Sequence, residues 1–280
     1  MKSKKRNYFE RWYFRLQSDK LTMVLIPEIL YGENGESLGR LQVLFPNGAY
    51  SYTYEYPVNM NLPGSLFVVL GRNVFTEACL HLDLDQPDLR IKGDIYFDDE
   101  VGTKFRVMGP LGVFPLAKVV ATRQKVWAME QKVSGRLEVG RGRESFLFAP
   151  SRGYLEEQRG RTLPRGYFWS HCNWFDDADL AVSCAGADVD FAGKKEALRL
   201  CFGCIRWEGQ ELTMATYKGA RLERISPQAF AIRQGKYLLE GWKMEGAEDV
   251  RVECTVRYRL SKSNEILFDE ISKRGAYVYR

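Results

Sequence analysis

Histidine is scarce in this chain, since only two of its 280 residues, His81 and His171, are histidines. A metal centre made of several histidines is therefore excluded. The sequence also has no phosphate-binding glycine loop, dinucleotide fingerprint, nucleophile elbow or zinc-protease helix motif. Nucleotide-dependent and common hydrolytic chemistries consequently have no support, and we expect neither a cofactor nor a metal.

Long hydrophobic runs are missing as well. No run approaches the roughly 18 apolar residues of a membrane-spanning helix, and the first 20 residues are basic and aromatic rather than signal-like. The six cysteines lack regular spacing, and Cys201 and Cys204 form a lone CxxC pair. We therefore expect reduced core thiols in a cytoplasmic protein, with zinc binding or redox use of the pair as the alternative.

Charge of one sign is not concentrated anywhere beyond the short basic run at residues 2–6. The chain has 41 basic and 36 acidic side chains, a net charge of +5, scattered through the sequence. Without a basic face, nucleic-acid binding is not expected. The basic run is interpreted as a solvated tail, and a peripheral contact with anionic lipid is left open. Oligomeric state is not predicted.

Short stretches of alternating polar and apolar residues recur along most of the chain, separated by Gly, Pro and Asn turns. They include residues 40–45, 91–97 and 250–260, and each predicts a strand with one buried face. Residues 135–148 predict a hairpin. Residues 108–115 are rich in proline and glycine and predict a linker or turn. Residues 116–132 form the one segment without proline or glycine that is long enough for a helix, and they predict one.

Four tyrosines share one face of the strand predicted at residues 49–56: Tyr50, Tyr52, Tyr54 and Tyr56. They indicate either a barrel wall whose hydroxyls reach water or the wall of a cavity for a flat, partly polar ligand.

His81 alternates with Asp83 and Asp85. This spacing is typical of a solvated outer face, and the alternative of a metal site lacks further ligands.

Many short strands with almost no helix predict an all-β protein. We expect two antiparallel β-barrel or sandwich units packed side by side, one formed by residues 1–130 and the other by residues 131–280.

Two stretches carry the functional signal, residues 8–15 and residues 153–175. The first places one carboxylate, Glu10, among aromatic residues, and the second places a pair of carboxylates among them and adds His171 and Asn173. Glycines and a proline interrupt the second stretch, which predicts a strand, a loop and a strand.

These two stretches resemble the signatures of the tocopherol cyclase family. The first match is Tyr8-Phe9-Glu10 followed by Trp12-Tyr13-Phe14, and the second comprises Tyr154, Glu156, Gly160, Pro164, Trp169, Cys172, Asn173 and Phe175. Collinear matches at Met108-Gly109-Pro110 and Ala215-Thr216-Tyr217 extend the resemblance over residues 8–260. It implies lipocalin-like β units and, as in the plant members, cyclisation of a prenylated quinol to a chromanol.

The chain departs from the family pattern at several positions: Arg11, Glu157, Gln158, Arg159, Tyr167 and His171. Gln124 and Gln131 stand where the family has histidines near the domain junction. A glutamine cannot donate a proton as an acid, so a role that depends on those histidines is lost.

The cyclisation implied by the resemblance needs an acid, a wall that tolerates a tertiary cation, and a proton acceptor. A carboxyl group in an apolar pocket stays neutral and can act as the acid, which assigns Glu156 and Glu10. His171 is assigned as acceptor or relay. The expected ligand wall comprises Trp12, Tyr154, Trp169, Asn173 and Tyr217. The alternative is structural: arginines satisfy the carboxylates, and the aromatic residues are plain core.

Two functions follow. One is a tocopherol cyclase-like enzyme that binds a prenyl quinol or a similar bulky apolar molecule in a β-barrel cavity and cyclises it after protonation. The other is a carrier of lipids or isoprenoids that has lost the catalytic residues. In both, Glu10 and Glu156 are expected to converge in one apolar hollow.

Overall fold

The computed structural model describes residues 6–46, 51–61, 66–98, 107–108, 122–161, 166–189, 198–245 and 250–280. Throughout these ranges the chain forms antiparallel strands and one short 3-10 turn, with no α-helix. The prediction of an all-β fold is confirmed. No helix in the described ranges is long and apolar enough to cross a membrane.

The chain divides into two compact units, and each is discontinuous in sequence. Unit 1 comprises Met1–Phe105 and Glu130–Arg161, and unit 2 comprises Arg106–Met129 and Thr162–Arg280. The chain passes from one unit to the other at residues 105–106, 129–130 and 161–162. The division into domains of residues 1–130 and 131–280 stays a prediction.

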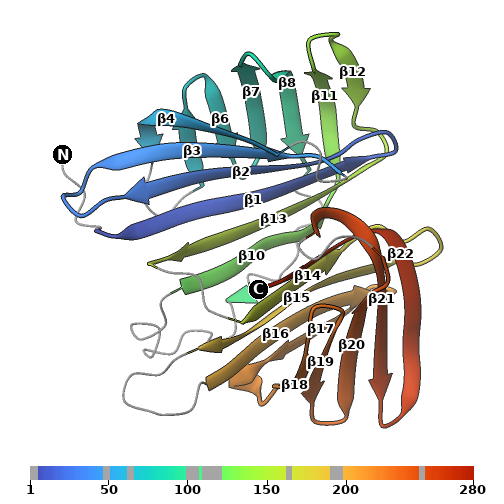
Figure 1. Cartoon of the computed structure of the whole chain (residues 1–280). Coiled ribbons are helices and arrows are strands. Elements are labelled where there is room, and N and C mark those ends of the chain that lie inside the picture. Colours follow the sequence, from blue (N-terminus) through green and yellow to red (C-terminus); the bar gives the residue numbers. More distant parts are fainter. Residues whose placement is uncertain are drawn as a thin grey trace. The chain divides into compact units, whose positions relative to one another are not determined.

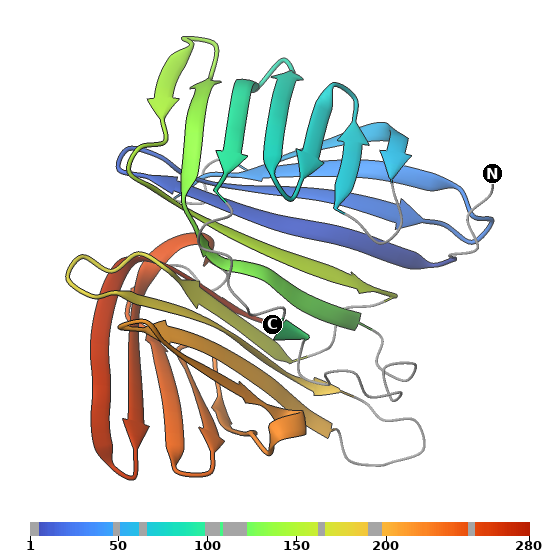
Figure 2. The same ribbon diagram turned by 180° about the vertical axis from the view of Figure 1, so that it is seen from behind.

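Unit 1 is one curled sheet, coloured blue to yellow-green in Figures 1 and 2. Its strands are β1 (Tyr8–Ser18), β2 (Thr22–Tyr31), β3 (Ser37–Leu44), β4 (Ser51–Asn61), β5 (Phe67–Leu70), β6 (Asn73–Thr76), β7 (Cys79–Asp85), β8 (Arg90–Phe97), β11 (Val133–Val139), β12 (Glu144–Leu147) and β13 (Ser151–Gly160). The order across the sheet is β12-β11-β8-β7-β6-β5-β4-β3-β2-β1-β13. Most neighbours are joined by hairpins, and the predicted hairpin at residues 135–148 is confirmed as β11 and β12.

Unit 2 contains a nine-stranded sheet in the order β17-β16-β15-β14-β22-β21-β20-β19-β18. The strands are β14 (Tyr167–Cys172), β15 (Leu180–Val189), β16 (Leu198–Trp207), β17 (Gln210–Ala215), β18 (Arg221–Ile225), β19 (Ala229–Gln234), β20 (Tyr237–Lys243), β21 (Val250–Lys262) and β22 (Glu265–Tyr279). The 3-10 turn η3 (Thr216–Lys218) follows β17. Strand β9 (Val107–Met108) pairs with β10 (Thr122–Gln131).

The helix predicted at residues 116–132 is wrong where the structure describes it, because residues 122–131 form strand β10. In β10, Val126, Ala128, Met129 and Glu130 are buried and Trp127 is half-buried. The second half of the strand is thus buried on both faces, and its sequence consequently lacks the strict alternation that predicts a strand. Residues 109–121, which carry most of the predicted linker and the start of the predicted helix, lie outside the described ranges.

One face of the unit 1 sheet forms its core, and we call it the inner face. Residues directly opposite in an antiparallel pair point to the same side. The pairs Phe14–Leu25, Leu25–Val43 and Val43–Tyr52 therefore place these four residues on the inner face. Phe14 is fully buried, and its ring centroid lies 6.0 Å from those of Phe75 and Phe97.

The tyrosines of β4 lie on the same inner face. Tyr52, Tyr54 and Tyr56 are half-buried. The residues that alternate with them are exposed: Ser51, Thr53, Glu55 and Pro57. The predicted alternation is therefore confirmed for these residues, and Tyr50 lies outside the described ranges. The rings of Tyr52 and Tyr54 stack at 6.3 Å, and the Tyr54 hydroxyl donates a 2.6 Å hydrogen bond to Asp88. Burial, followed by this hydrogen bond, raises the pKa of Tyr54.

The interior of unit 2 is filled by its own aromatic rings. Phe168 and Phe230 stack with centroids 4.6 Å apart, and Tyr258 and Tyr277 pack against Phe230. Gly241 faces Phe230, and a Cβ atom built there would lie 2.1 Å from the ring. A packed ring cluster rather than a ligand-sized space occupies this part of unit 2.

Candidate functional site

Strands β1 and β13 pair side by side and carry both glutamates. Their register places Glu10 opposite Arg159, and Glu156 opposite Tyr13. Glu10 therefore shares the inner face with Phe14, whereas Tyr13 and Glu156 point to the opposite face, which we call the second face. The expectation that Glu10 and Glu156 converge in one hollow is wrong, because a sheet separates the two side chains.

Glu10 is 3% exposed at one end of the inner face. The Tyr31 hydroxyl donates a 3.1 Å hydrogen bond to its Oε2, and Arg159 Nη1 lies 3.6 Å from its Oε1. Arg159 also forms a close ion pair with Glu157, which lies on the same face. The predicted acid Glu10 is thus part of a carboxylate–guanidinium cluster that the strands β1, β2 and β13 assemble.

Trp12 lies on the inner face next to this cluster, opposite Glu157. The side chain is 1% exposed. Within the described ranges its indole Nε1 has no hydrogen-bond partner. Buried N–H groups are nearly always paired, so this orphaned donor is unusual for a folded protein.

Glu156 occupies the second face and is 1% exposed. The Tyr154 hydroxyl donates a 2.6 Å hydrogen bond to its Oε2, and Gln158 Nε2 donates one of 2.7 Å to its Oε1. Arg11 in turn donates to Gln158 through Nε at 2.9 Å. The Tyr13 and Tyr154 rings meet edge to face at 6.1 Å. Two predicted residues, Glu156 and Tyr154, are therefore brought into direct contact.

Strand β14 in unit 2 carries Trp169 and His171 on the face opposite its core. Both are buried, and their rings stack at 6.2 Å. His171 Nε2 lies 3.3 Å from the carbonyl oxygen of Met129, and Asn173 Nδ2 donates to the same oxygen at 3.1 Å. A carbonyl only accepts, so Nε2 of His171 carries a hydrogen. The structure thus joins His171 and Asn173 at one backbone carbonyl, with Trp169 stacked on His171.

The core face of β14 holds a second polar pair. Ser170 and Tyr258 share a 2.5 Å hydrogen bond, and Ser170 also donates to the carbonyl oxygen of Ala276 at 3.0 Å. Burial raises the pKa of Tyr258 well above its ordinary value. Because these groups satisfy one another within a packed core, they are structural.

Tyr217 is the predicted ligand residue that stands apart from the buried candidates. It lies in the turn η3, is 38% exposed, and has Lys218 Nζ 5.9 Å from its ring centroid.

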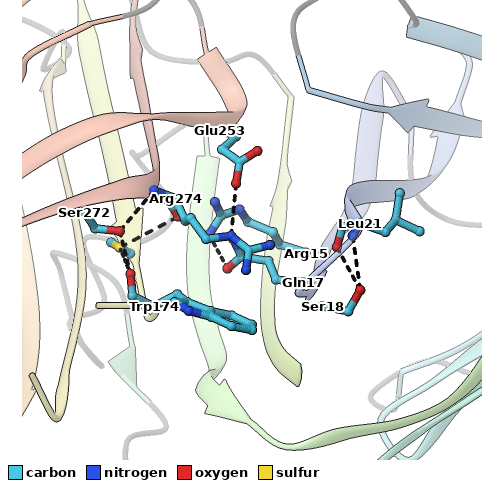
Figure 3. A network of polar contacts seen from close by, with 9 residues as sticks. Arg15, Gln17, Ser18, Leu21, Trp174, Glu253, Ser272 and Arg274 are labelled. Carbon is cyan, nitrogen blue, oxygen red and sulfur yellow. Dashed lines mark hydrogen bonds and ion pairs between the residues drawn. The ribbon is translucent and has the colours of Figure 1, made fainter. Parts of the chain in front are cut away.

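A polar network links the end of β14 with β21 and β22 (Figure 3). The Arg274 guanidinium lies 4.1 Å from the centroid of the Trp174 ring and donates a 3.1 Å hydrogen bond to Glu253. Ser272 donates to the carbonyl oxygen of Trp174 and accepts from the Arg274 amide. These contacts fix the segment that follows His171 and Asn173. Figure 3 also shows Arg15 donating to Gln17, both on the second face of unit 1.

No group of three or more metal-competent side chains occurs in the described ranges. His81 is exposed and bonds to Asp94 at 2.7 Å, while Asp83 pairs with Arg72 at 3.1 Å. The interpretation of this strand face as solvated is in keeping with these contacts. All six cysteines are free, and Cys201 and Cys204 are buried on opposite faces of β16.

The sequence could not reveal several partners of the site residues. Tyr31 reaches Glu10 through the pairing of β1 with β2, whereas the Met129 carbonyl of β10 reaches His171 of β14 although these two strands do not pair. Nothing in the local sequence marks either partner. Gln158 and Arg159 depart from the family pattern, and both directly contact the candidate glutamates.

Solved structures share the all-β fold of this chain. Kievitone hydratase from Nectria haematococca has a TM-score of 0.56 and 14% identity, with 97% of this chain and 88% of that chain covered. An AttH-type protein from Nitrosomonas europaea has a TM-score of 0.54 and 11% identity, with 96% of this chain and 91% of that chain covered. CghA with Sch210972 has a TM-score of 0.52 and 8% identity, with 96% of this chain and 87% of that chain covered. No family model and no curated protein matches the sequence. At these identities the likeness shows a shared fold.

Proposed function

We propose that this protein binds a bulky, largely apolar molecule and transfers a proton to one of its carbon–carbon double bonds, with Glu156 as the proton donor. The observation that carries the proposal is the environment of Glu156. It is 1% exposed, and Tyr154 and Gln158 each donate a hydrogen bond to one of its oxygens. A neutral carboxyl group gives up its proton more readily when donors are already placed to stabilise the carboxylate.

A cyclase and a hydratase share this first step. The proton of Glu156 adds to one alkene carbon, and the other carbon becomes a tertiary cation. In a cyclase a phenolic oxygen of the same molecule attacks the cation and loses its proton. In a hydratase a water oxygen attacks and loses its proton instead. In either case the released proton returns to the Glu156 carboxylate, directly or through Tyr154, 2.6 Å away.

The tocopherol cyclase-like signatures favour a prenyl quinol as substrate, and the fold shared with a hydratase favours the same chemical step. Cyclisation and hydration start from the same cation, and the substrate determines which of the two reactions follows. As an alternative to return through Tyr154, we propose His171 as the acceptor or relay of the released proton, since hydrogen on Nε2 leaves Nδ1 as the acceptor of the neutral ring. Trp169, Asn173 and Tyr217 remain proposed ligand contacts, and Trp12, which lies on the inner face away from Glu156, remains one for the carrier function. The free cysteines support a reducing compartment such as the cytoplasm.

The second candidate function is a non-catalytic carrier of lipids or isoprenoids. The Glu10 cluster favours it, because Arg159 lies against both Glu10 and Glu157. A guanidinium carries a full positive charge and favours the ionised carboxylate more strongly than the neutral donors around Glu156 do, so Glu10 is less able to hold the proton that an acid must deliver. Of the two proposed acids, Glu10 is therefore the weaker candidate.

The test is incubation of the purified protein with a prenylated quinol, followed by chromatography and mass spectrometry. A cyclase gives an isomer with altered retention, and a hydratase gives a product heavier by one water. Glu156→Gln is expected to lower the rate at least about 100-fold, in line with general acid catalysis. Glu77→Gln, at an exposed glutamate of the same unit, serves as the control and retains the rate. An unchanged rate in Glu156→Gln would exclude the assignment, and binding without turnover would favour the carrier.

A further inference from the structure

Two half-buried side chains on the second face of unit 1 lead to Glu156. Strands β1 and β13 place Arg11 directly opposite Gln158. Arg11 Nε donates a 2.9 Å hydrogen bond to Gln158 Oε1, and Arg11 Nη2 donates to the same oxygen. Gln158 Nε2 in turn donates to Oε1 of Glu156 at 2.7 Å. The Arg11 guanidinium thus reaches the proposed acid through one amide group.

The contact with Arg11 fixes the orientation of the Gln158 amide. An amide group has an accepting oxygen and a donating nitrogen, and a half-turn exchanges the two. A guanidinium has five N–H donors and no acceptor, so only the amide oxygen can face it. The nitrogen of Gln158 consequently points at Glu156 and can only donate to it. Without this contact, either end of the amide could face the carboxyl group.

The fixed amide determines which oxygen of Glu156 carries the proton of the neutral acid. Oε1 accepts from Gln158, and a hydrogen on Oε1 would oppose that donor. The proton therefore lies on Oε2, the oxygen that is 2.6 Å from the Tyr154 hydroxyl. A hydroxyl group both donates and accepts, so Tyr154 is compatible with Oε2 before and after the proton leaves.

We propose that Arg11 is a positioning residue that acts through Gln158 and keeps the transferable proton of Glu156 on Oε2. This inference rests on the proposed function, in which Glu156 is the acid. Arg11 and Gln158 are two of the positions at which the chain departs from the tocopherol cyclase pattern. The structure shows that these two departures contact each other, so each is expected to depend on the other.

The first test needs no substrate. Nitrogen-15 spectra of the full chain follow the side-chain amide signal of Gln158, which is identified by its absence from Gln158→Glu. We expect this signal to shift in Arg11→Met and in Glu156→Gln, because the amide contacts both side chains. Arg143→Met, at an exposed arginine of the same unit, is the control and leaves the signal in place. An unmoved signal in Arg11→Met would overturn the positioning role alone.

The second test measures turnover of a prenylated quinol. Arg11→Met should lower kcat about tenfold, the equivalent of one hydrogen bond, and leave KM unchanged. Arg11→Lys should restore part of this loss, because an ammonium group also only donates. Gln158→Glu has nearly the same shape and still accepts from Arg11, but it draws the Glu156 proton toward Oε1, so kcat should fall about 100-fold.

A double variant shows whether Arg11 acts through Gln158. Arg11→Met combined with Gln158→Glu should lose much less than the product of the two single losses, because both changes affect one contact. Losses that multiply, or an Arg11→Met variant that changes KM alone, would overturn the inference. Absence of turnover in the unmodified protein would overturn the proposed function and the positioning role with it, which an unmoved amide signal does not do.

Discussion

The Gly241→Ala substitution tests whether the interior of unit 2 is filled by its own rings. A Cβ atom at this position would lie 2.1 Å from Cε1 and 2.5 Å from Cζ of Phe230. Real contacts to a Cβ atom essentially never fall below 3.0 Å. Phe230 is fully buried and stacks on Phe168 at 4.6 Å, so its ring has no free direction in which to move.

Overpacking of a close-packed core costs about 1–3 kcal/mol. For a chain of this size, each kcal/mol lost from the free energy of unfolding lowers the melting temperature by about 2–4 °C. A loss of about 2 kcal/mol should therefore lower it by about 4–8 °C. Thermal unfolding followed by circular dichroism measures this shift. Gly142→Ala is the matched control, because a Cβ atom there meets nothing within 4 Å.

A rescue experiment separates the ring contact from a general effect of alanine. Phe230→Leu shortens the side chain that the added methyl group would meet, so the double variant should be less unstable than the sum of the two single variants. The reasoning is refuted if Gly241→Ala melts at the same temperature as Gly142→Ala. That outcome would mean that unit 2 contains free space, and a ligand site inside it would then have to be considered.

Two further predictions concern charge and thiol chemistry. Arg257 donates two 2.6 Å hydrogen bonds to Asp269 and thereby lowers the pKa of Asp269. A pKa that is lower in the folded state stabilises the protein above the ordinary value of 3.8. In urea unfolding, the unmodified protein should therefore be more stable than Asp269→Asn at neutral pH, and this difference should vanish as the pH falls below that value. Burial raises the pKa of the Cys201 thiol to about 11 and keeps Cys184 and Cys204 protonated. Iodoacetamide at pH 8 should therefore label the half-buried Cys79 in the folded protein, and the five buried cysteines only after unfolding. Mass spectrometry identifies the labelled residues.

Alternation along single strands was predictable from the sequence, because a side-chain period of two is a local property. The tyrosines of β4 and the buried set of β21 (Val252, Cys254, Val256, Tyr258 and Leu260) lie as predicted. The strand at residues 122–131, β10, was missed for a local reason too. Its second half is buried on both faces and includes Glu130, a charged residue that forms an ion pair with Arg152, so the pattern of apolar residues looked irregular.

The candidate site was only partly predictable, because it depends on register between strands that are far apart in sequence. Glu10 and Glu156 each lie among aromatic residues, and local pattern alone made them appear equivalent. The pairing of Tyr13 with Glu156, and not with Glu157, places the two acids on opposite faces of the sheet. A shift of one residue would have reversed this result, and no feature within either strand fixes it.

Deuterium incorporation tests the central claim, that Glu156 delivers a proton to carbon, most directly. The protein is equilibrated in heavy water and given a prenylated quinol, and the product is examined by mass spectrometry and NMR. The account predicts one deuterium at the protonated alkene carbon, and a strong loss of this product with Glu156→Gln but not with Glu77→Gln. Product that carries no deuterium on carbon, or labelled product formed equally well by Glu156→Gln, would contradict it.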